Sequence, residues 1–213
     1  MRLIAAELAE DTAIPVRLPA FAPKIVRMDD AILDLDIETV AAGFADPDWV
    51  PQKITCVAWS WIGSDEVESR VCGPTGLFGK PDNRARMLEP LLGQIMEADI
   101  LTGHNIARFD LPIINSECMR LGLEPIRRVR VQDTMRLAVR SKGFKKGQDN
   151  LASLFKAPEQ KLNLNWQEWQ DAYDEDGWGM IRRRCESDVI SHKQIREKLL
   201  AADLVKATRW WNG

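Results

Sequence analysis

Several common signals are missing from this sequence, and each absence argues against a class of protein. The four cysteines are widely spaced among 213 residues and form no Cys-x-x-Cys pair, unlike those of a disulfide framework or a cysteine zinc site. No apolar run approaches the roughly 20 residues that span a bilayer. The acidic Glu7 comes too early for a secretory signal. We therefore expect a globular protein of the reducing cytoplasm with no membrane partner.

The chain also lacks an overall positive charge, since its net charge is −3. A nucleic-acid partner would therefore need a local basic patch. Arginines and lysines gather between residues 127 and 146, where Asp133 is the only acidic residue. This stretch, which includes Lys145 and Lys146, predicts a phosphate-binding track with sequence-independent affinity. A solvated charged surface is the alternative.

The length of the chain fits one domain, and its order of apolar segments predicts an α/β fold. We expect an N-terminal extension at 1–30, a domain at 31–205 and a C-terminal tail at 206–213. Strands are predicted at 31–38, 54–62, 67–72, 99–102 and 130–132. Helices are predicted at about 83–96, 108–121, 134–140, 148–156, 165–175 and 178–202. This order predicts an antiparallel meander extended by parallel strands, which gives a central mixed sheet flanked by helices.

The first predicted strand carries two neighbouring carboxylates, Asp36 and Glu38. Side chains alternate along a strand, so these two emerge on the same face. Two carboxylates side by side repel each other and are costly in a core. A hard divalent cation bound between them would remove this cost, because Mg²⁺ and Mn²⁺ prefer oxygen ligands. Solvation of both groups is the alternative.

Two further carboxylates, Asp110 and Asp188, occur at positions where they could lie near Asp36 and Glu38. Asp110 falls in the first turn of a helix, directly after the strand end at residues 103–105. Asp188 lies on the apolar face of the last long helix, together with Ile181, Cys185 and His192. A carboxylate on that inward face is expensive unless a cation compensates it.

The motifs around these residues resemble those of a known family. Asp36-x-Glu38-Thr39, Gly103-His104-Asn105 with Phe109-Asp110, and Cys185-x-x-Asp188-Val189 resemble the three motifs of DEDD (DnaQ-like) 3′–5′ exonucleases. The likeness covers roughly residues 30–200 and is greatest to the tyrosine-type branch, as in the proofreading domains of family B DNA polymerases. It implies a ribonuclease H-like fold and a stand-alone exonuclease of DNA replication or repair. The host would be a bacterium or a phage-infected cell.

The resemblance also implies roles for individual residues. Two divalent ions, Mg²⁺ or Mn²⁺, would be held by four carboxylates: Asp36, Glu38, Asp110 and Asp188. The substrate would be a DNA 3′ end, single-stranded or frayed, hydrolysed by a two-metal mechanism. Substrate contacts would come from Thr39, His104, Asn105 and Phe109. A helix cap and a core aromatic are the alternatives for Asn105 and Phe109.

One position departs from the family pattern. The family has Tyr or His four or five residues before the last Asp to activate the water, whereas here Arg183 and Arg184 stand at those positions. Arginine stays protonated and cannot act as a general base. Three interpretations remain: activation by metal alone with Arg184 binding the scissile phosphate, activation by His192 one turn after Asp188, or a catalytically weakened end-binding module.

The sequence leaves open the kind of nucleic acid and the role of the C-terminus. The same fold serves RNA exonucleases, and no residue in the sequence indicates recognition of a 2′-hydroxyl. The C-terminal pair Trp210-Trp211 either packs back on the domain or docks on a replication or repair partner.

Overall fold

The computed structural model describes residues 29–40, 53–72, 83–138, 145–159, 162, 164–165, 168–169, 171, 178–204 and 208–213. The predicted N-terminal extension lies outside these residues except for its last two positions. Most of the helix predicted at 165–175 and the part of the basic stretch at 139–144 also lie outside the described residues.

A six-stranded mixed sheet forms the centre of the molecule, in the order β3-β2-β1-β4-β5-β6. Its strands are β1 (Ile32–Val40), β2 (Lys53–Trp61), β3 (Glu68–Val71), β4 (Ile100–Gly103), β5 (Val129–Asp133) and β6 (Arg209–Trp211). The first three strands are antiparallel neighbours, while β1, β4 and β5 run parallel. The predicted antiparallel meander extended by parallel strands is therefore confirmed.

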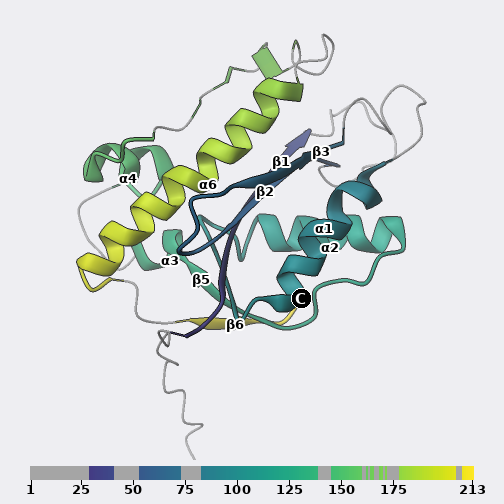
Figure 1. Ribbon diagram of the computed structural model, residues 1–213, viewed down its shortest axis with the longest axis horizontal. Helices are drawn as coiled ribbons and strands as arrows, with labels where there is room; N and C mark the ends of the chain where they lie inside the picture. Colours follow the sequence, from purple (N-terminus) through teal and green to yellow (C-terminus); the bar gives the residue numbers. More distant parts are fainter. Residues whose placement is uncertain are drawn as a thin grey trace, which may run out of the picture.

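Helices cover both faces of this sheet (Figure 1). They are α1 (Arg84–Glu97), α2 (Asp110–Leu121), α3 (Thr134–Ala138), α4 (Gln148–Phe155) and α6 (Trp178–Ala201). The long α6 packs on β1, β2 and β3 and carries α4 on its side, whereas α1 and α2 lie across the other face. The predicted α/β fold with a flanked mixed sheet is confirmed.

The alternation of side chains along β1 divides the chemistry between these two layers. Leu33, Leu35 and Ile37 belong to the hydrophobic core. The intervening carboxylates of Asp34, Asp36 and Glu38 point toward α6, where they contact His192, Cys185 and Arg184 respectively. One strand thus supplies apolar packing to one layer and a row of acidic groups to the other.

Gly103 ends β4 at a point where the backbone comes very close to β1. A Cβ atom at this position would lie 3.0 Å from the Leu35 carbonyl oxygen and 3.0 Å from Ile106 Cβ. Only glycine fits without displacing the backbone. The next turn places Asn105 in the left-handed region at φ 68°, where asparagine is tolerated better than most residues.

The C-terminal residues form an edge strand that the sequence did not predict. β6 pairs antiparallel with β5, and the Trp211 Nε1–H donates to the Ala107 carbonyl at 3.2 Å. Trp210 is 46% exposed and stacks against the guanidinium of Arg128, 4.2 Å from the ring centre. Of the two tryptophans, Trp211 packs on the domain. A partner that binds the exposed Trp210 remains a prediction.

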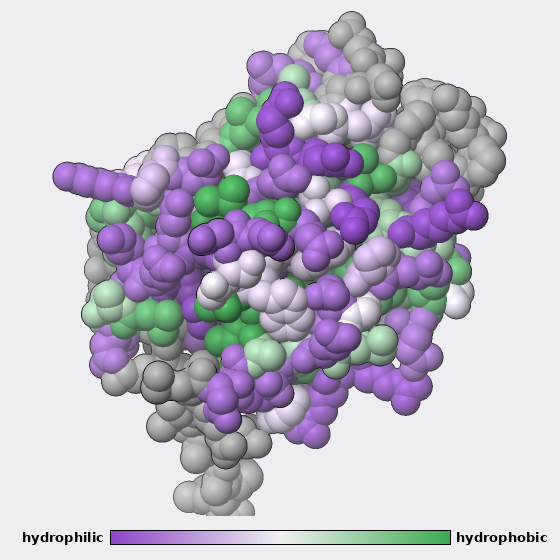
Figure 2. Space-filling view, in the orientation of Figure 1, coloured by the Kyte–Doolittle hydropathy of each residue, from purple (hydrophilic) through white to green (hydrophobic). Residues whose placement is uncertain are grey.

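The four cysteines are free and buried, which confirms their interpretation as small core residues. The face seen in Figure 2 is mostly hydrophilic, with hydrophobic residues in small separate groups. Within the described ranges, no helix has the length and apolar character needed to cross a membrane.

Candidate functional site

Asp36 and Glu38 occupy the end of β1 that lies beneath α6. Asp36 is half-buried and Glu38 is 8% exposed. The register of β1 against β2 shifts between Glu38 and Thr39, and such bulges often change the direction of a side chain next to a functional site. Two acidic groups are therefore fixed on one face of the sheet, close to the C-terminal end of β1.

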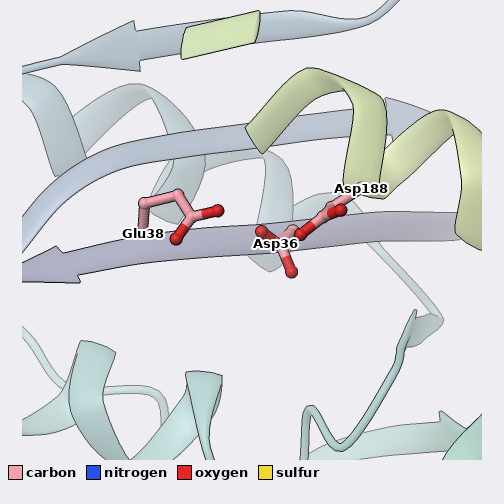
Figure 3. A group of neighbouring side chains, drawn as sticks. All are labelled: Asp36, Glu38 and Asp188. Carbon is pink, nitrogen blue, oxygen red and sulfur yellow. The ribbon is translucent and has the colours of Figure 1, made fainter. Parts of the chain in front are cut away.

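Asp188 joins them from α6. Its side chain is 1% exposed, and Figure 3 shows its carboxylate directed toward that of Asp36, with Glu38 beside them. One carboxylate oxygen from each of these three residues lies within 4.8 Å of the others. Gln148 Nε2 donates to the Asp188 backbone carbonyl at 2.8 Å and so ties the start of α4 to this turn of α6. The three oxygens form a donor set that suits a hard divalent cation.

Asp110 approaches the same place from the start of α2. β1 continues beyond the last residue paired with β4, and the Asp110 Oδ1 accepts the Ile37 backbone N–H at 3.2 Å. Asp110 is 3% exposed, and burial raises the pKa of its carboxyl to about 7, with smaller contributions from the charges of Glu38 and Asp133. A bound cation would favour the ionised form. The fourth predicted carboxylate therefore sits where charge compensation is needed.

Arg184 supplies a positive charge within this group. Its Nε lies 2.7 Å from Glu38 Oε1, and its Nη2 lies 3.8 Å from Asp188 Oδ2. The guanidinium also stacks over the Trp169 ring at 5.3 Å and donates to the Leu162 carbonyl. Arg184 thus acts here as a counter-ion to two carboxylates.

A pocket of about 420 Å³ opens at these residues. Its acidic side consists of Asp36, Glu38, Asp110, Asp188 and also Asp149. Its remaining lining includes His104, Asn105, Phe109, Met135, Gln148 and Arg184. The structure therefore brings together, at one pocket, eight of the residues that the sequence proposed for this site. Its volume lies in the range of small-ligand pockets.

Three predicted substrate residues are not among those that line this pocket in the described part of the chain: Thr39, Lys145 and Lys146. Lys145 is exposed and Lys146 is half-buried just before α4. Both lysines lie next to the lining residue Gly147, so their contact with a longer strand outside the pocket remains a prediction.

The structure places His192, one of the residues predicted as a possible activator of the attacking water, away from the residues that line this pocket. His192 is 2% exposed and is not among the lining residues. Its Nδ1 lies 2.7 Å from Asp34 Oδ2, and its Nε2 lies 2.9 Å from Thr134 Oγ1. Both ring nitrogens are engaged by buried partners. His192 lies one turn beyond Asp188 on α6, and its side chain is directed at the middle of β1 rather than at the pocket.

Two acidic residues that shape the site were not assigned from the sequence. Asp133 Oδ1 and Oδ2 accept the backbone N–H groups of Asn105 and Ala107 at 3.1 and 3.3 Å, and so hold the loop that follows β4. Asp149 lines the pocket, and its Oδ1 is buried with no hydrogen-bond partner among the described residues. The position of Asp149 after a glycine, at the start of a helix, was the available signal.

Comparison with known proteins bears on the fold. The structure matches that of a family B DNA polymerase from the hyperthermophilic archaeon Pyrobaculum calidifontis, with a TM-score of 0.59 and 19% sequence identity. The fold is ribonuclease H-like, as predicted. The match covers 82% of this chain but only 25% of the polymerase chain. No protein-family model and no curated protein sequence matches the chain.

Proposed function

We propose that this protein is a metal-dependent 3′–5′ exonuclease that hydrolyses phosphodiester bonds at DNA 3′ ends, single-stranded or frayed. The observation that carries the proposal is the convergence of Asp36, Glu38 and Asp188 within 4.8 Å, with Asp110 in the same pocket. Four carboxylates from two helices and one strand meet at one point, and a divalent cation bound there would compensate their negative charge.

The donor set fits the two divalent ions that the family resemblance implies. All four groups offer oxygen atoms, which Mg²⁺ and Mn²⁺ prefer, and the raised pKa of Asp110 marks a place where an added positive charge is favourable. When bound, such ions supply Lewis-acid activation of water and stabilise charge on a phosphoryl group. Asp36, Glu38 and Asp188 would hold one ion together, and Asp110 would complete the site from α2.

The remaining lining would position the end of a strand. His104, Asn105 and Phe109 stand on the loop between β4 and α2, and Asp133 fixes the backbone of that loop. Because the pocket has the size of a small-ligand site, it would take a terminal nucleotide. The basic residues outside it would hold the preceding phosphates with salt-dependent affinity.

Arg184 favours a second candidate function. Its guanidinium contacts Glu38 and Asp188, so it compensates charge that a metal ion would otherwise compensate. A site in which this arginine replaces the ion would bind nucleic-acid ends without hydrolysing them. An exoribonuclease with the same chemistry is the third possibility, because the fold serves both substrates.

The test is a time course with 5′-labelled single-stranded DNA and, in parallel, labelled RNA, each with Mn²⁺ or with EDTA. The proposal predicts a ladder that shortens from the 3′ end of DNA and disappears with EDTA. Asp36→Asn should abolish cleavage, whereas the control Asp99→Asn, which removes an exposed carboxylate that accepts the Ala31 N–H, should retain it.

Three outcomes would contradict the proposal, and each has a different explanation. Preferential cleavage of RNA would assign the ribonuclease function. A gel shift of DNA without cleavage, unchanged by Mn²⁺, would assign the end-binding module. Cleavage that survives in Asp36→Asn would place the activity outside this site or in a contaminant.

A further inference from the structure

The side chain of Cys185 links α6 to both the backbone and the carboxylate of Asp36. Cys185 is fully buried, and its Sγ lies 3.4 Å from the Asp36 carbonyl oxygen and 3.7 Å from Asp36 Oδ2. A thiol has one S–H, which is a weak donor. Because both acceptors belong to the same residue, either hydrogen bond restrains Asp36.

The peptide unit between Asp36 and Ile37 is held by side chains from two helices. Its carbonyl accepts from Cys185 on α6, and its N–H donates to Asp110 Oδ1 on α2 at 3.2 Å. β1 pairs with β4 only as far as Asp34. Beyond that point, these two helices therefore help to fix the part of β1 that carries the acidic pocket.

The position of Cys185 on α6 explains why it can act on Asp36. Cys185 and Asp188 are one helical turn apart, so both face β1. Asp188 brings its carboxylate to that of Asp36 (Figure 3), while Cys185 is packed in the hydrophobic core beside it. A side chain whose own position is fixed by packing can hold a neighbouring group in one orientation.

We propose that Cys185 is a positioning residue for the cation site: its S–H donates to Asp36 and holds the Asp36 carboxylate toward those of Glu38 and Asp188. The cation rests on the proposed function, whereas the hydrogen bond does not. Mg²⁺ and Mn²⁺ prefer oxygen ligands to sulfur, so the thiol acts through Asp36 and is not itself a ligand. Loss of a group that orients a metal ligand weakens metal binding by roughly 10–100-fold, and a weak donor belongs at the lower end of that range.

Mn²⁺ binding to variants of Cys185 tests this role in the absence of DNA. Calorimetric titration with Mn²⁺ should give a Kd about tenfold higher for Cys185→Ala than for wild type. Cys185→Ser keeps a donor at nearly the same place, so its Kd should stay within about threefold of the wild-type value. The matched control is Cys118→Ala, which removes another fully buried thiol of the same core and should leave the affinity for Mn²⁺ unchanged.

Three results of this titration would overturn the proposal. Equal Mn²⁺ affinity in Cys185→Ala and wild type would show that the thiol does not orient Asp36. Equal weakening by Cys185→Ala and Cys185→Ser would assign the effect to the lost sulfur volume instead of the hydrogen bond. Equal weakening by Cys118→Ala would assign it to a general loosening of the core.

The hydrogen bond itself can be observed in the wild-type protein without metal. The S–H stretching band of Cys185, identified in Raman spectra by its loss in Cys185→Ser, should lie at a lower frequency than the band of a thiol dissolved in an apolar solvent, because donation weakens the S–H bond. A band at the unbonded frequency would refute the proposal, even where Cys185→Ala does not fold.

Failure of the proposed function gives a different result from failure of this role. A wild-type protein that binds no Mn²⁺ and cleaves no DNA would reject the proposed function and the cation assigned to Asp36, while the Raman band still decides whether Cys185 donates. A wild-type protein that binds Mn²⁺ and cleaves DNA, with Cys185→Ala equal to it in both assays, would reject only the role of Cys185.

Discussion

Replacement of the Asp110 carboxylate by an amide should stabilise the metal-free protein at high pH. Burial raises the pKa of this carboxyl from 3.8 to about 7, so the folded state binds the proton more tightly than the unfolded state does. Each pKa unit corresponds to about 1.4 kcal/mol. The rise of about three units therefore means that ionised Asp110 lowers the free energy of unfolding by up to about 4 kcal/mol.

Because the pKa of Asp110 is raised in the folded state, the pH range of its effect on stability can be predicted. The unfavourable contribution of Asp110 is absent below pH 3.8, grows as the pH rises and is complete above about 7. Asp110→Asn keeps an oxygen that can accept the Ile37 N–H but removes the charge. The free energy of unfolding of the variant should therefore exceed that of wild type above pH 7, and the difference should fade in acid.

Urea unfolding of both proteins in EDTA, over a pH series from acid to above 8, measures this difference. Asp99→Asn is the control, because it removes an exposed carboxylate that accepts the Ala31 N–H at 2.9 Å; its effect should stay within about 0.5 kcal/mol. A gain for Asp110→Asn that does not change with pH, or a loss of stability at high pH, would refute the burial reasoning. Addition of Mn²⁺ should stabilise wild type more than Asp110→Asn, because the variant lacks one of the four carboxylates.

Three further changes test other parts of the structure. Gly103→Ala should lower the free energy of unfolding by about 1–3 kcal/mol in urea titrations, because the new Cβ meets the Leu35 carbonyl at 3.0 Å; an unchanged midpoint would show that β4 can move. Arg184→Met removes the cation beside two carboxylates, so calorimetric titration should show Mn²⁺ binding about tenfold tighter, and equal affinity would contradict its role as a counter-ion. Trp211→Phe removes the bond to the Ala107 carbonyl and should cost about 1 kcal/mol in thermal unfolding; a neutral result would mean that β6 is held by its backbone alone.

The arrangement of the strands was largely predictable because it depends on local patterns. The apolar runs marked five of the six strands, and Gly122 marked the end of α2, where it adopts φ 71°. Asp133, directly before α3, accepts the Arg136 N–H at 3.2 Å, as its type and position at a helix start favour. The three-residue β6 was missed because so short a segment has no detectable period and forms only where β5 leaves a free edge.

By itself, the sequence placed Asp36 and Glu38 on one face of a strand, and Arg184 and Asp188 on one face of a helix. Both results follow from the fixed periods of regular structure. The tertiary structure alone decided which of these groups meet. The angle at which α6 crosses β1 brings Arg184 to Glu38 but turns His192 inward to Asp34. Neighbours on one helix face can thus lie in a pocket or in the core, because the packing partner changes along the helix axis.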